Sequence, residues 1–440
     1  MPMSSDSPRR FAVIGSGISG LMAAYVLARN DHVTLFEADN RLGGHAHTHD
    51  VPLPNATTVQ VDTGFIVHNQ RTYPTLIRLF DELGVQTRES DMSMSVAIPD
   101  VGLEYAGGKG IRGLIPSSSS LRNRRYLRLL TQVPRFHRAA RRLLAEPESM
   151  PVSLRGFLDD VGFDADFHDY FITPLVSAVW SCDPADALDY PARYLFTFLD
   201  HHGMLSITGS PTWRTVVGGS ARYVDRVAAE LPDVRIGTPV AALTRRSGGV
   251  TVTTEAGSSE EFDGAVVATH PHQALRLLAQ PTSRERELLS AITYSPNRAL
   301  LHTDESVLPI TANARASWNY LVPPSNRATP DGVVVTYDVT RLMRLSAGGP
   351  RMLVTLNGSE FVDPAMVIDE MSYEHPLYTA AAVDAAAALD EIDSGTIAFA
   401  GAYRGWGFHE DGALAGLRAA QRLGGRWTPK SNSPIALARR

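Results

Sequence analysis

The chain has 440 residues, of which 44% are hydrophobic and 20% charged, and its formal net charge is −6. A chain of this length is expected to form two or three domains with a sizeable core, and its negative charge argues against general nucleic-acid binding. Cys182 is the single cysteine, so no internal disulfide can form and a reducing, cytoplasmic location is expected. Residues 1–10 are polar, unlike a signal peptide, and no apolar run is long enough to predict a transmembrane helix.

The first forty residues predict a dinucleotide-binding unit. Phe11–Ile14 has the pattern of a short buried strand, the residues after Gly17 have helical spacing, and Val33–Phe36 has the pattern of a second strand. The intervening G-x-G-x-x-G allows a tight turn, a close approach to a pyrophosphate and close packing of helix on strand. The helix N-terminus also offers free N–H groups to phosphates. The candidate contacts are Gly15, Gly17, Ile18, Ser19 and Gly20.

Glu37 ends the second predicted strand, with Ala38 beside it. This is the spacing of a carboxylate that binds the ribose hydroxyls of a dinucleotide, and an acid there disfavours the 2′-phosphate of NADP. This unit alone does not show whether the bound dinucleotide is NAD or FAD.

The next motif, Arg41-Leu42-Gly43-Gly44, favours FAD. With it the chain resembles the flavin-containing amine oxidase superfamily, which also holds protoporphyrinogen oxidase and the carotenoid desaturases. The resemblance covers nearly the whole chain and implies a second phosphate contact by Arg41, Gly43 and Gly44. His45 stands where an arginine is frequent. The chain is similar to a bacterial subgroup of FAD-binding oxidoreductases often encoded beside cyclopropane-fatty-acyl-phospholipid synthases.

The resemblance implies an α/β fold. A discontinuous Rossmann-like FAD-binding domain of the amine oxidase/glutathione reductase type would carry an inserted substrate domain of helices and mixed sheet. We expect the FAD-binding domain at 1–70, 205–290 and 391–427, the substrate domain at 71–204 and 291–390, and a flexible tail at 428–440.

Two patterns follow the glycine motifs. His45, His47 and His49 alternate, but no carboxylate or cysteine lies at a spacing that would complete a metal site, so no metal is expected. The run 61–68 has the pattern of a strand that contains a glycine, which often marks close approach of another group. Thr63 and Gly64 are therefore candidates for the flavin edge, the alternative being a bulge in a structural strand. Residues 73–83 predict an amphipathic helix stopped by a glycine.

Residues 121–145 are the most basic part of the chain. Leu127, Leu130, Val133, Leu143 and Leu144 fall roughly along one helical side, and eight arginines crowd the rest. Such helices can lie on anionic membranes. The alternatives are a solvated helix face, or two helices broken near the proline at 134.

Residues 154–202 are dense in aromatic side chains. Aromatic residues at this density suit either the walls around an apolar ligand or simple core packing. Cys182 lies within this segment without a recognisable motif, and we expect it to be inert.

The chain then returns to the cofactor domain. A Gly-Gly turn at 218–219 precedes a helix to about residue 231, and the resemblance places Val240 beside the adenine. Residues 250–254 predict a hairpin strand. Residues 262–269 predict a buried strand that ends in the superfamily's second dinucleotide turn, with Ala268 and Thr269 as contacts.

Four strand-like runs, at 299–302, 316–322, 333–337 and 352–356, predict the sheet of the substrate domain. Residues 396–401 predict the last cofactor strand, followed by a helix over 413–423. The resemblance places the helix N-terminus at the flavin N1–C2=O edge, where it would stabilise reduced flavin. No cysteine occurs there, so FAD is expected to be noncovalent. The contacts implied in this part are Gly401, Ala402 (where an acid is common), Asp411, Gly412 and Ala413.

Many amine oxidases of the superfamily hold a water at flavin N5 with a lysine on the substrate-domain strand after the second turn. Here that strand, 295–302, has none, and the chain has only Lys109 and Lys430. Amine oxidation is therefore disfavoured. His409 and Trp406 are the catalytic candidates, His409 as an acid or base near neutral pH or as a histidine that hydrogen-bonds backbone. Further flavin-face candidates are His68, Trp318 and Tyr320.

Three functions remain open. The first is an FAD-dependent oxidoreductase that dehydrogenates or isomerises an unsaturated or branched acyl lipid by hydride transfer to flavin N5. The second is a flavin amine oxidase. The third is a flavin-binding partner of a lipid-modifying methyltransferase. The basic segment adds the expectation of peripheral contact with an anionic membrane, on the inner face of the cell membrane.

Overall fold

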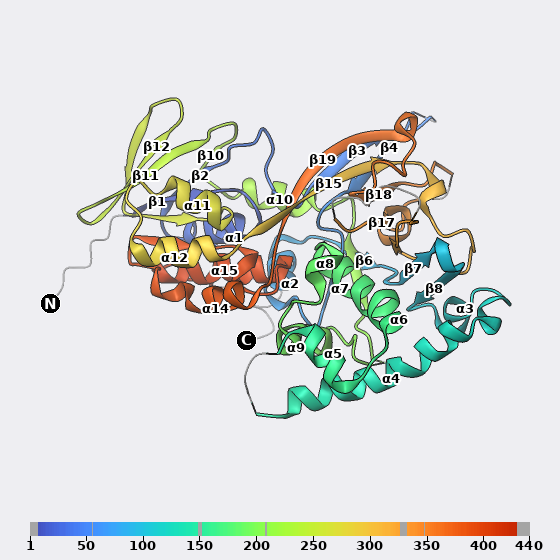
Figure 1. Ribbon diagram of the computed structural model, residues 1–440. Coiled ribbons are helices and arrows are strands. Elements are labelled where there is room, and N and C mark those ends of the chain that lie inside the picture. The colour runs from blue at the N-terminus through green and yellow to red at the C-terminus, as the bar shows by residue number, and fades with distance from the viewer. Residues whose placement is uncertain are drawn as a thin grey trace, which may run out of the picture.

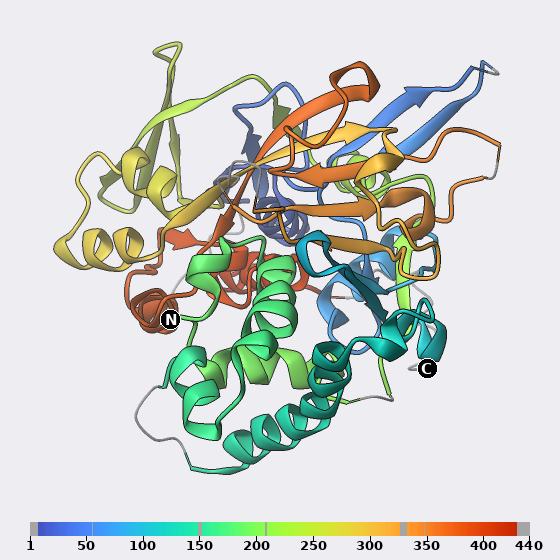
Figure 2. The same cartoon turned by 45° about the vertical axis from the view of Figure 1, so that its right-hand side comes forward.

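The computed structural model describes residues 8–54, 56–147, 152–206, 209–325, 332–346 and 348–428. The predicted tail at 428–440 lies outside these ranges except for its first residue. The predicted α/β fold is confirmed, with a parallel sheet at one end of the molecule and a mixed sheet at the other (Figures 1 and 2).

A five-stranded parallel sheet forms the core of the cofactor end. Its strands alternate between two hydrophobic clusters, with Phe11 and Val13 facing one and Ala12 and Ile14 the other. Burial on both faces is typical of a parallel sheet. In spatial order the strands are β10 (Asp233–Arg235), β2 (His32–Phe36), β1 (Arg10–Ile14), β14 (Gly264–Val267) and β20 (Ile397–Phe399).

Helices and a small sheet cover the two faces (Figure 1). The first face carries α1 (Ile18–Leu27), α2 (Pro74–Leu83), α10 (Ala221–Ala228) and α15 (His409–Arg422). The second face carries β11 (Val240–Arg246), β12 (Gly249–Thr254), β13 (Ser259–Phe262), α11 (Pro271–Leu277), α12 (Ser283–Ala291) and α14 (Ala380–Ala388). Because α2 packs on the cofactor end, it lies apart from the rest of the segment predicted to begin the substrate domain. The domain bounds stay a prediction.

A seven-stranded sheet forms the other end, and only β16 and β7 pair in parallel. The sequence located four of its strands but missed β7, β8 and β19. In spatial order the strands are β19 (Val367–Pro376), β15 (Tyr294–His302), β18 (Leu353–Leu356), β17 (Val335–Asp338), β16 (Trp318–Leu321), β7 (Met94–Ile98) and β8 (Leu103–Gly107). Smaller sheets join β3 (Thr48–Pro52) to β4 (Thr58–Asp62), and β5 (His68–Asn69) to β9 (Trp213–Val216) and β6 (Thr87–Glu89).

The basic segment forms one helix, α4 (Arg124–Ala145), so the alternative of two helices broken at Pro134 is wrong. Pro134 is exposed, and the helix continues through it although proline removes one backbone hydrogen bond. The predicted apolar face was also partly wrong. Tyr126, Leu129 and Phe136 are buried, whereas Leu127 is exposed.

The aromatic segment packs mostly against itself and α4, as the core-packing alternative predicted. Phe136, for example, lies 5.4 Å from Phe196 between ring centroids. The helices involved are α5 (Leu154–Val161), α6 (Ala165–Phe167), η3 (His168–Ile172), α7 (Thr173–Trp180), α8 (Pro184–Ala187) and α9 (Ala192–His201). In the described part of the chain, no helix is both long and apolar enough to cross a bilayer.

Candidate functional site

The three glycines of the first motif differ in what a side chain at each position would meet. Gly15 has φ +97°, and a Cβ there would lie 2.6 Å from the carbonyl oxygen of Ala268. A Cβ on Gly20 would lie 1.8 Å from the Gly15 oxygen. Gly17, by contrast, has φ −60° and nothing within 4 Å of its Cβ position. Folding therefore requires Gly15 and Gly20, whereas Gly17 borders open space at the N-terminus of α1, where no side chain caps the helix.

The second glycine motif lies directly against the first. Gly43 and Gly44 have φ +108° and +56°, and Gly43 bridges to Gly17. The Gly43 amide contacts the backbone and side-chain oxygens of Ser16, each at 3.1 Å. Arg41 Nη1 donates to the Gly44 oxygen at 2.8 Å. Two motifs that are about 25 residues apart thus form one surface of glycine backbone, which suits a pyrophosphate.

Glu37 lies at the same edge. Its carboxylate accepts hydrogen bonds from the Ser16 amide at 2.8 Å and from the Asp39 amide at 2.9 Å. The Thr238 amide donates to the Glu37 carbonyl at 2.8 Å, which brings the segment just before Val240 of β11 to the end of β2. The ribose contact of Glu37 and the adenine contact of Val240 stay predictions.

The close approach of the protein's own backbone explains why residue 64 is a glycine. A Cβ there would lie 2.2 Å from the His45 oxygen, which accepts from the Phe65 amide at 2.7 Å. The predicted strand over 61–68 was wrong in its middle, because β4 ends at Asp62 and β5 begins at His68. Thr63 is buried, and its hydroxyl lies 2.7 Å from that of Tyr373.

The last helix begins earlier than predicted. α15 starts at His409, because the Asp411 carboxylate accepts from the Phe408 amide at 2.9 Å and so caps the helix. The start predicted for this helix, at residue 413 directly after Gly412, was therefore wrong. A Cβ on Gly412 would lie 2.7 Å from Ile18, so this glycine permits α15 to pack on α1. Gly401 and Ala402 follow β20, and Ala402 begins the short helix η7 (Ala402–Arg404) that precedes α15.

His409 does not suit the acid–base role predicted for it. Its Nε2 lies 2.6 Å from the Tyr223 hydroxyl, and its ring stacks on Phe65 at 3.7 Å. Burial lowers the pKa of His409 to about 3, so the imidazole stays neutral near pH 7. His68 lies nearby, 6.4 Å from Phe65 between ring centroids.

Trp406 lies among aromatic rings of the helical segment. Its carbonyl accepts from the Trp180 indole at 3.1 Å, and its own buried indole N–H has no hydrogen-bond partner among the described residues. Trp318 and Tyr320 lie elsewhere, on β16 in the other sheet.

The sequence missed a group of polar side chains where β15 and β19 reach the glycine surface. Asn297 is buried, and its Nδ2 lies 3.0 Å from Nδ1 of His375. The His375 ring lies 5.4 Å from that of His45, whose buried Nε2 has no partner among the described residues. His270, next to Thr269, is 2.8 Å from Glu374. Asn297 and His375 are roughly eighty residues apart in the sequence, and the pairing of β15 with β19 brings them together. No local sequence pattern could show this.

One group in the described ranges has the donors of a metal site. The nitrogen and oxygen atoms of His270, His272 and Glu374 all lie within 4.8 Å of one another. The prediction of no metal considered only the alternating histidines at 45–49 and did not consider this group.

These features fit FAD. Two adjoining glycine turns, the open space at Gly17, the helix N-terminus without a side-chain cap and the unpartnered nitrogen of His45 all suit the phosphates and polar edge of a dinucleotide. Cys182 is buried, and burial raises the pKa of its thiol to about 12, so it stays a neutral thiol, as expected of an inert residue.

Acidification is expected to destabilise the protein. Burial lowers the pKa of His302 and His375 to about 4 and that of His409 to about 3. An unfolded histidine titrates near 6.5, so the unfolded state binds more protons as the pH falls from about 6.5 towards 4, and stability falls with it. Asp62 and Asp411, whose pKa values burial raises to about 6 and about 7, oppose this trend but are fewer.

Thermal unfolding midpoints measured near neutral pH and near about pH 5 would check this expectation. A His302→Gln variant should show a weaker dependence on pH. A midpoint that rises on acidification would contradict the assignment of neutral, buried histidines.

Comparisons with known proteins agree with the geometry. The family model described as flavin containing amine oxidoreductase matches residues 18–345. An L-amino acid dehydrogenase of Synechocystis sp. is 26% identical over 285 residues, which cover 61% of this chain and 57% of that protein. The chain thus spans less than two thirds of the length of the curated relatives it matches.

Two solved structures share the fold. A variant of a putrescine oxidase has a TM-score of 0.67 at 17% identity, covering 95% of this chain and 99% of that one. A CLA-producing fatty acid isomerase from P. acnes has a TM-score of 0.68 at 16% identity, covering 94% of this chain and 98% of that one. At these identities the likeness establishes the fold alone.

Proposed function

Because the chain belongs to the family of flavin-containing amine oxidoreductases, we propose that it is an FAD-dependent oxidoreductase that acts on an acyl lipid. The reaction would be dehydrogenation or isomerisation near a double bond or a branch of the chain. FAD is the cofactor, and when bound it supplies a hydride acceptor. The glycine turns, Glu37 and Arg41 would hold it, and the residues of β15, β19 and the aromatic segment would bind and orient the substrate.

The observation that carries the proposal is the environment of β15. This strand presents buried Asn297, with its amide against neutral His375, in place of a lysine. The one lysine in the described ranges, Lys109, donates to the carbonyls of Asn313 at 2.9 Å and Arg315 at 2.6 Å near β8 and β16. Lys430 lies outside the described residues. An amine oxidase that uses a lysine at this strand is therefore disfavoured.

Aromatic rings pack together between α9 and the turn before α15. Tyr194 stacks on Tyr378 at 5.2 Å, Phe198 stacks on Phe408 at 4.7 Å, and Trp406 lies beside both Tyr194 and Phe198. An acyl chain that reached this cluster would meet apolar surroundings, where each buried CH₂ is worth about 0.8 kcal/mol. The unpartnered polar atoms of Tyr378 and Trp406 offer hydrogen bonds that would fix the orientation of a substrate.

The fold does not choose between substrates, because an amine oxidase and a fatty acid isomerase both share it. A flavin amine oxidase is the second candidate function, which family membership keeps open. A flavin-binding partner of a lipid-modifying methyltransferase is the third.

Anaerobic mixing tests the substrate. The FAD-loaded protein would be mixed with unsaturated or methyl-branched phospholipids, and separately with primary amines and polyamines, while the visible flavin absorbance is followed. We expect lipids to bleach the flavin or to emerge with a shifted double bond, and amines to do neither. A Gly17→Val protein, expected to lack flavin, serves as the matched control.

Rapid bleaching by amines, with the lipids unaltered, would overturn the lipid proposal in favour of amine oxidation. Flavin that neither class reduces, with the lipids unaltered, would favour the role of a non-catalytic partner.

A further inference from the structure

Four of the eight exposed large hydrophobic side chains in the described ranges lie at one end of the molecule. Ile111 on α3 (Gly110–Leu114) is 69% exposed, Leu121 on η2 (Ser120–Arg122) 55%, and Leu127 on the first turn of α4 37%. Ile310, in the loop before β16, is 91% exposed. The α3 end of the molecule is at the right of Figure 1, beside β8 and the start of α4.

Hydrogen bonds hold these segments together. The side chain of Asn313 donates to the carbonyl of Pro116 at 3.3 Å, and the Ile310 amide donates to Glu104 of β8 at 2.8 Å. The Tyr126 hydroxyl of α4 donates to the Leu114 carbonyl of α3. The four apolar side chains therefore belong to adjoining segments of a folded surface.

Free positive charge gathers at the same end. Arg112, Arg122 and Arg124 are exposed, and none is paired with a carboxylate in the described ranges. Further along α4, Arg128 pairs with Asp164 at 2.7 Å, and Arg135 donates to the last carbonyls of α5.

Carboxylates that contact the Ile310 loop are also engaged. Glu104 accepts from the amides of Ile310 and Thr311, and Glu305 pairs with Arg315 at 3.1 Å. Since neither is paired with Arg112, Arg122 or Arg124 in the described ranges, these arginines are left to attract an external anion.

We propose that the surface formed by Ile111, Leu121, Leu127 and Ile310 with Arg112, Arg122 and Arg124 docks on the face of an anionic phospholipid bilayer. Exposed apolar side chains next to unpaired arginines, as at Ile111–Arg112 and Leu121–Arg122, match the two layers of such a membrane, apolar below and negatively charged at the headgroups. The proposal rests on the proposed function only in expecting a membrane-borne substrate; the surface itself is argued from exposure and charge.

Co-sedimentation of the full FAD-loaded chain with vesicles tests the proposal. We expect binding to vesicles of equal parts phosphatidylcholine and phosphatidylglycerol, weak binding to phosphatidylcholine alone, and release by salt. Reversing Arg122 and Arg124 to Glu should weaken binding at least about 25-fold, or roughly 5-fold for each arginine lost. Ile111→Ser with Ile310→Ser should weaken it without changing the charge.

Arg138→Glu with Arg141→Glu is the matched control, because it makes the same charge change on the distant half of α4. This pair should weaken binding far less. Equal losses from both pairs would overturn the proposal in favour of a diffuse charge effect, and equal binding to neutral vesicles would overturn the role of the arginines. Binding to DNA or heparin that competes with vesicles and ignores the isoleucine changes would point to a polyanion instead. Vesicle binding is measured without turnover, so activity on amines alone would overturn the proposed function and leave this surface standing.

Discussion

A Gly17→Val protein is expected to fold normally and to lose its FAD. The Cβ position of Gly17 is open and its φ of −60° suits any residue, so valine adds no clash within the protein. The same open space is where the pyrophosphate is expected, and two γ-methyl groups would fill it. We expect the affinity to fall at least ~100-fold, or about 2.7 kcal/mol. Flavin released by heat denaturation, together with the thermal midpoint of the apoprotein, measures both parts of the expectation.

Gly20→Ala is the informative comparison. Its Cβ would lie 1.8 Å from the Gly15 oxygen, so this smaller change should damage folding as well as flavin binding. Full flavin on the Gly17→Val protein would show that the site is misassigned. Flavin that stays on the denatured wild-type chain would contradict noncovalent binding.

Local patterns predicted the cofactor end of the molecule well. The glycine turns and the two strands around them lie within forty residues, and each is set by contacts between near neighbours in the sequence. The sequence pattern could not show, however, which of the three glycines are required for packing. The structure shows that Gly15 is required against the turn after β14 and Gly20 against the Gly15 carbonyl, while Gly17 borders the open space.

The polar group at β15 and β19 could not be predicted in the same way. β19 is an edge strand with charged, exposed residues such as Asp369 and Glu370, which hide its strand character from a hydrophobicity pattern. Without that strand, nothing indicates that His375 lies beside Asn297. The site is therefore built by tertiary pairing between two distant strands.

The buried face of α4 was mispredicted for a related reason. Leucines at 127 and 130 suggested one side, but α5–α9 pack against the side that carries Leu129 and Phe136. The helix has more apolar residues than its neighbours cover, so Leu127 is left in solvent. The choice of face depends on which elements pack there, which the helix sequence alone does not contain.

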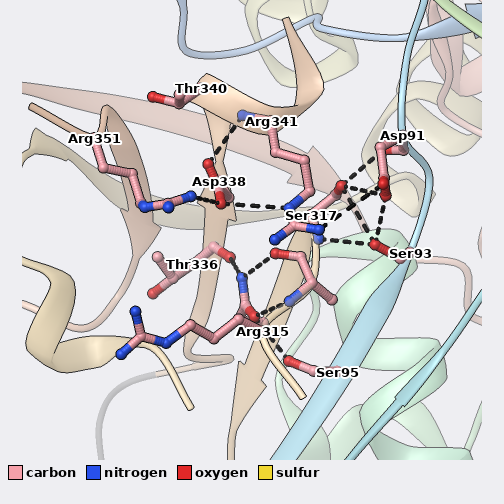
Figure 3. A network of polar contacts seen from close by, with 12 residues as sticks. Asp91, Ser93, Ser95, Arg315, Ser317, Thr336, Asp338, Thr340, Arg341 and Arg351 are labelled. Carbon is pink, nitrogen blue, oxygen red and sulfur yellow. Dashed lines mark hydrogen bonds and ion pairs between the residues drawn. The ribbon is translucent and has the colours of Figure 1, made fainter. Parts of the chain in front are cut away.

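A second large effect is expected at Asp338, in the mixed sheet. Figure 3 shows its carboxylate between the guanidinium groups of Arg341 and Arg351, with Asp91 on the far side of Arg341. Asp338 is fully buried at the end of β17, and it also accepts from the Arg341 amide at 3.0 Å as the cap of α13 (Val339–Leu342). The network extends through Asp91 to Ser93 and Ser317, and so ties β7 to β16 and β17.

Asp338→Ala is expected to destabilise the protein by about 3–5 kcal/mol, because it leaves two partly buried guanidinium groups without their shared partner. Asp338→Asn keeps an oxygen for the helix cap but removes the charge, so its cost should be intermediate. Glu370→Gln removes an exposed carboxylate that pairs with Arg298 on β15, and it should leave the unfolding midpoint unchanged. Urea titration of the three variants gives the ranking.

The flavin content of these variants adds a second readout. Asp338 lies in the mixed sheet and forms ion pairs with Arg341 and Arg351, and Arg341 also pairs with Asp91; in the described part of the chain none of these ion pairs includes a residue of the glycine turns. The Asp338→Ala protein should therefore retain FAD below its unfolding transition, in contrast to Gly17→Val, which should fold and lose it. Equal stability of Asp338→Ala and wild type would mean that water solvates the two arginines as well as Asp338 does. The network would then orient these side chains without adding to the free energy of unfolding.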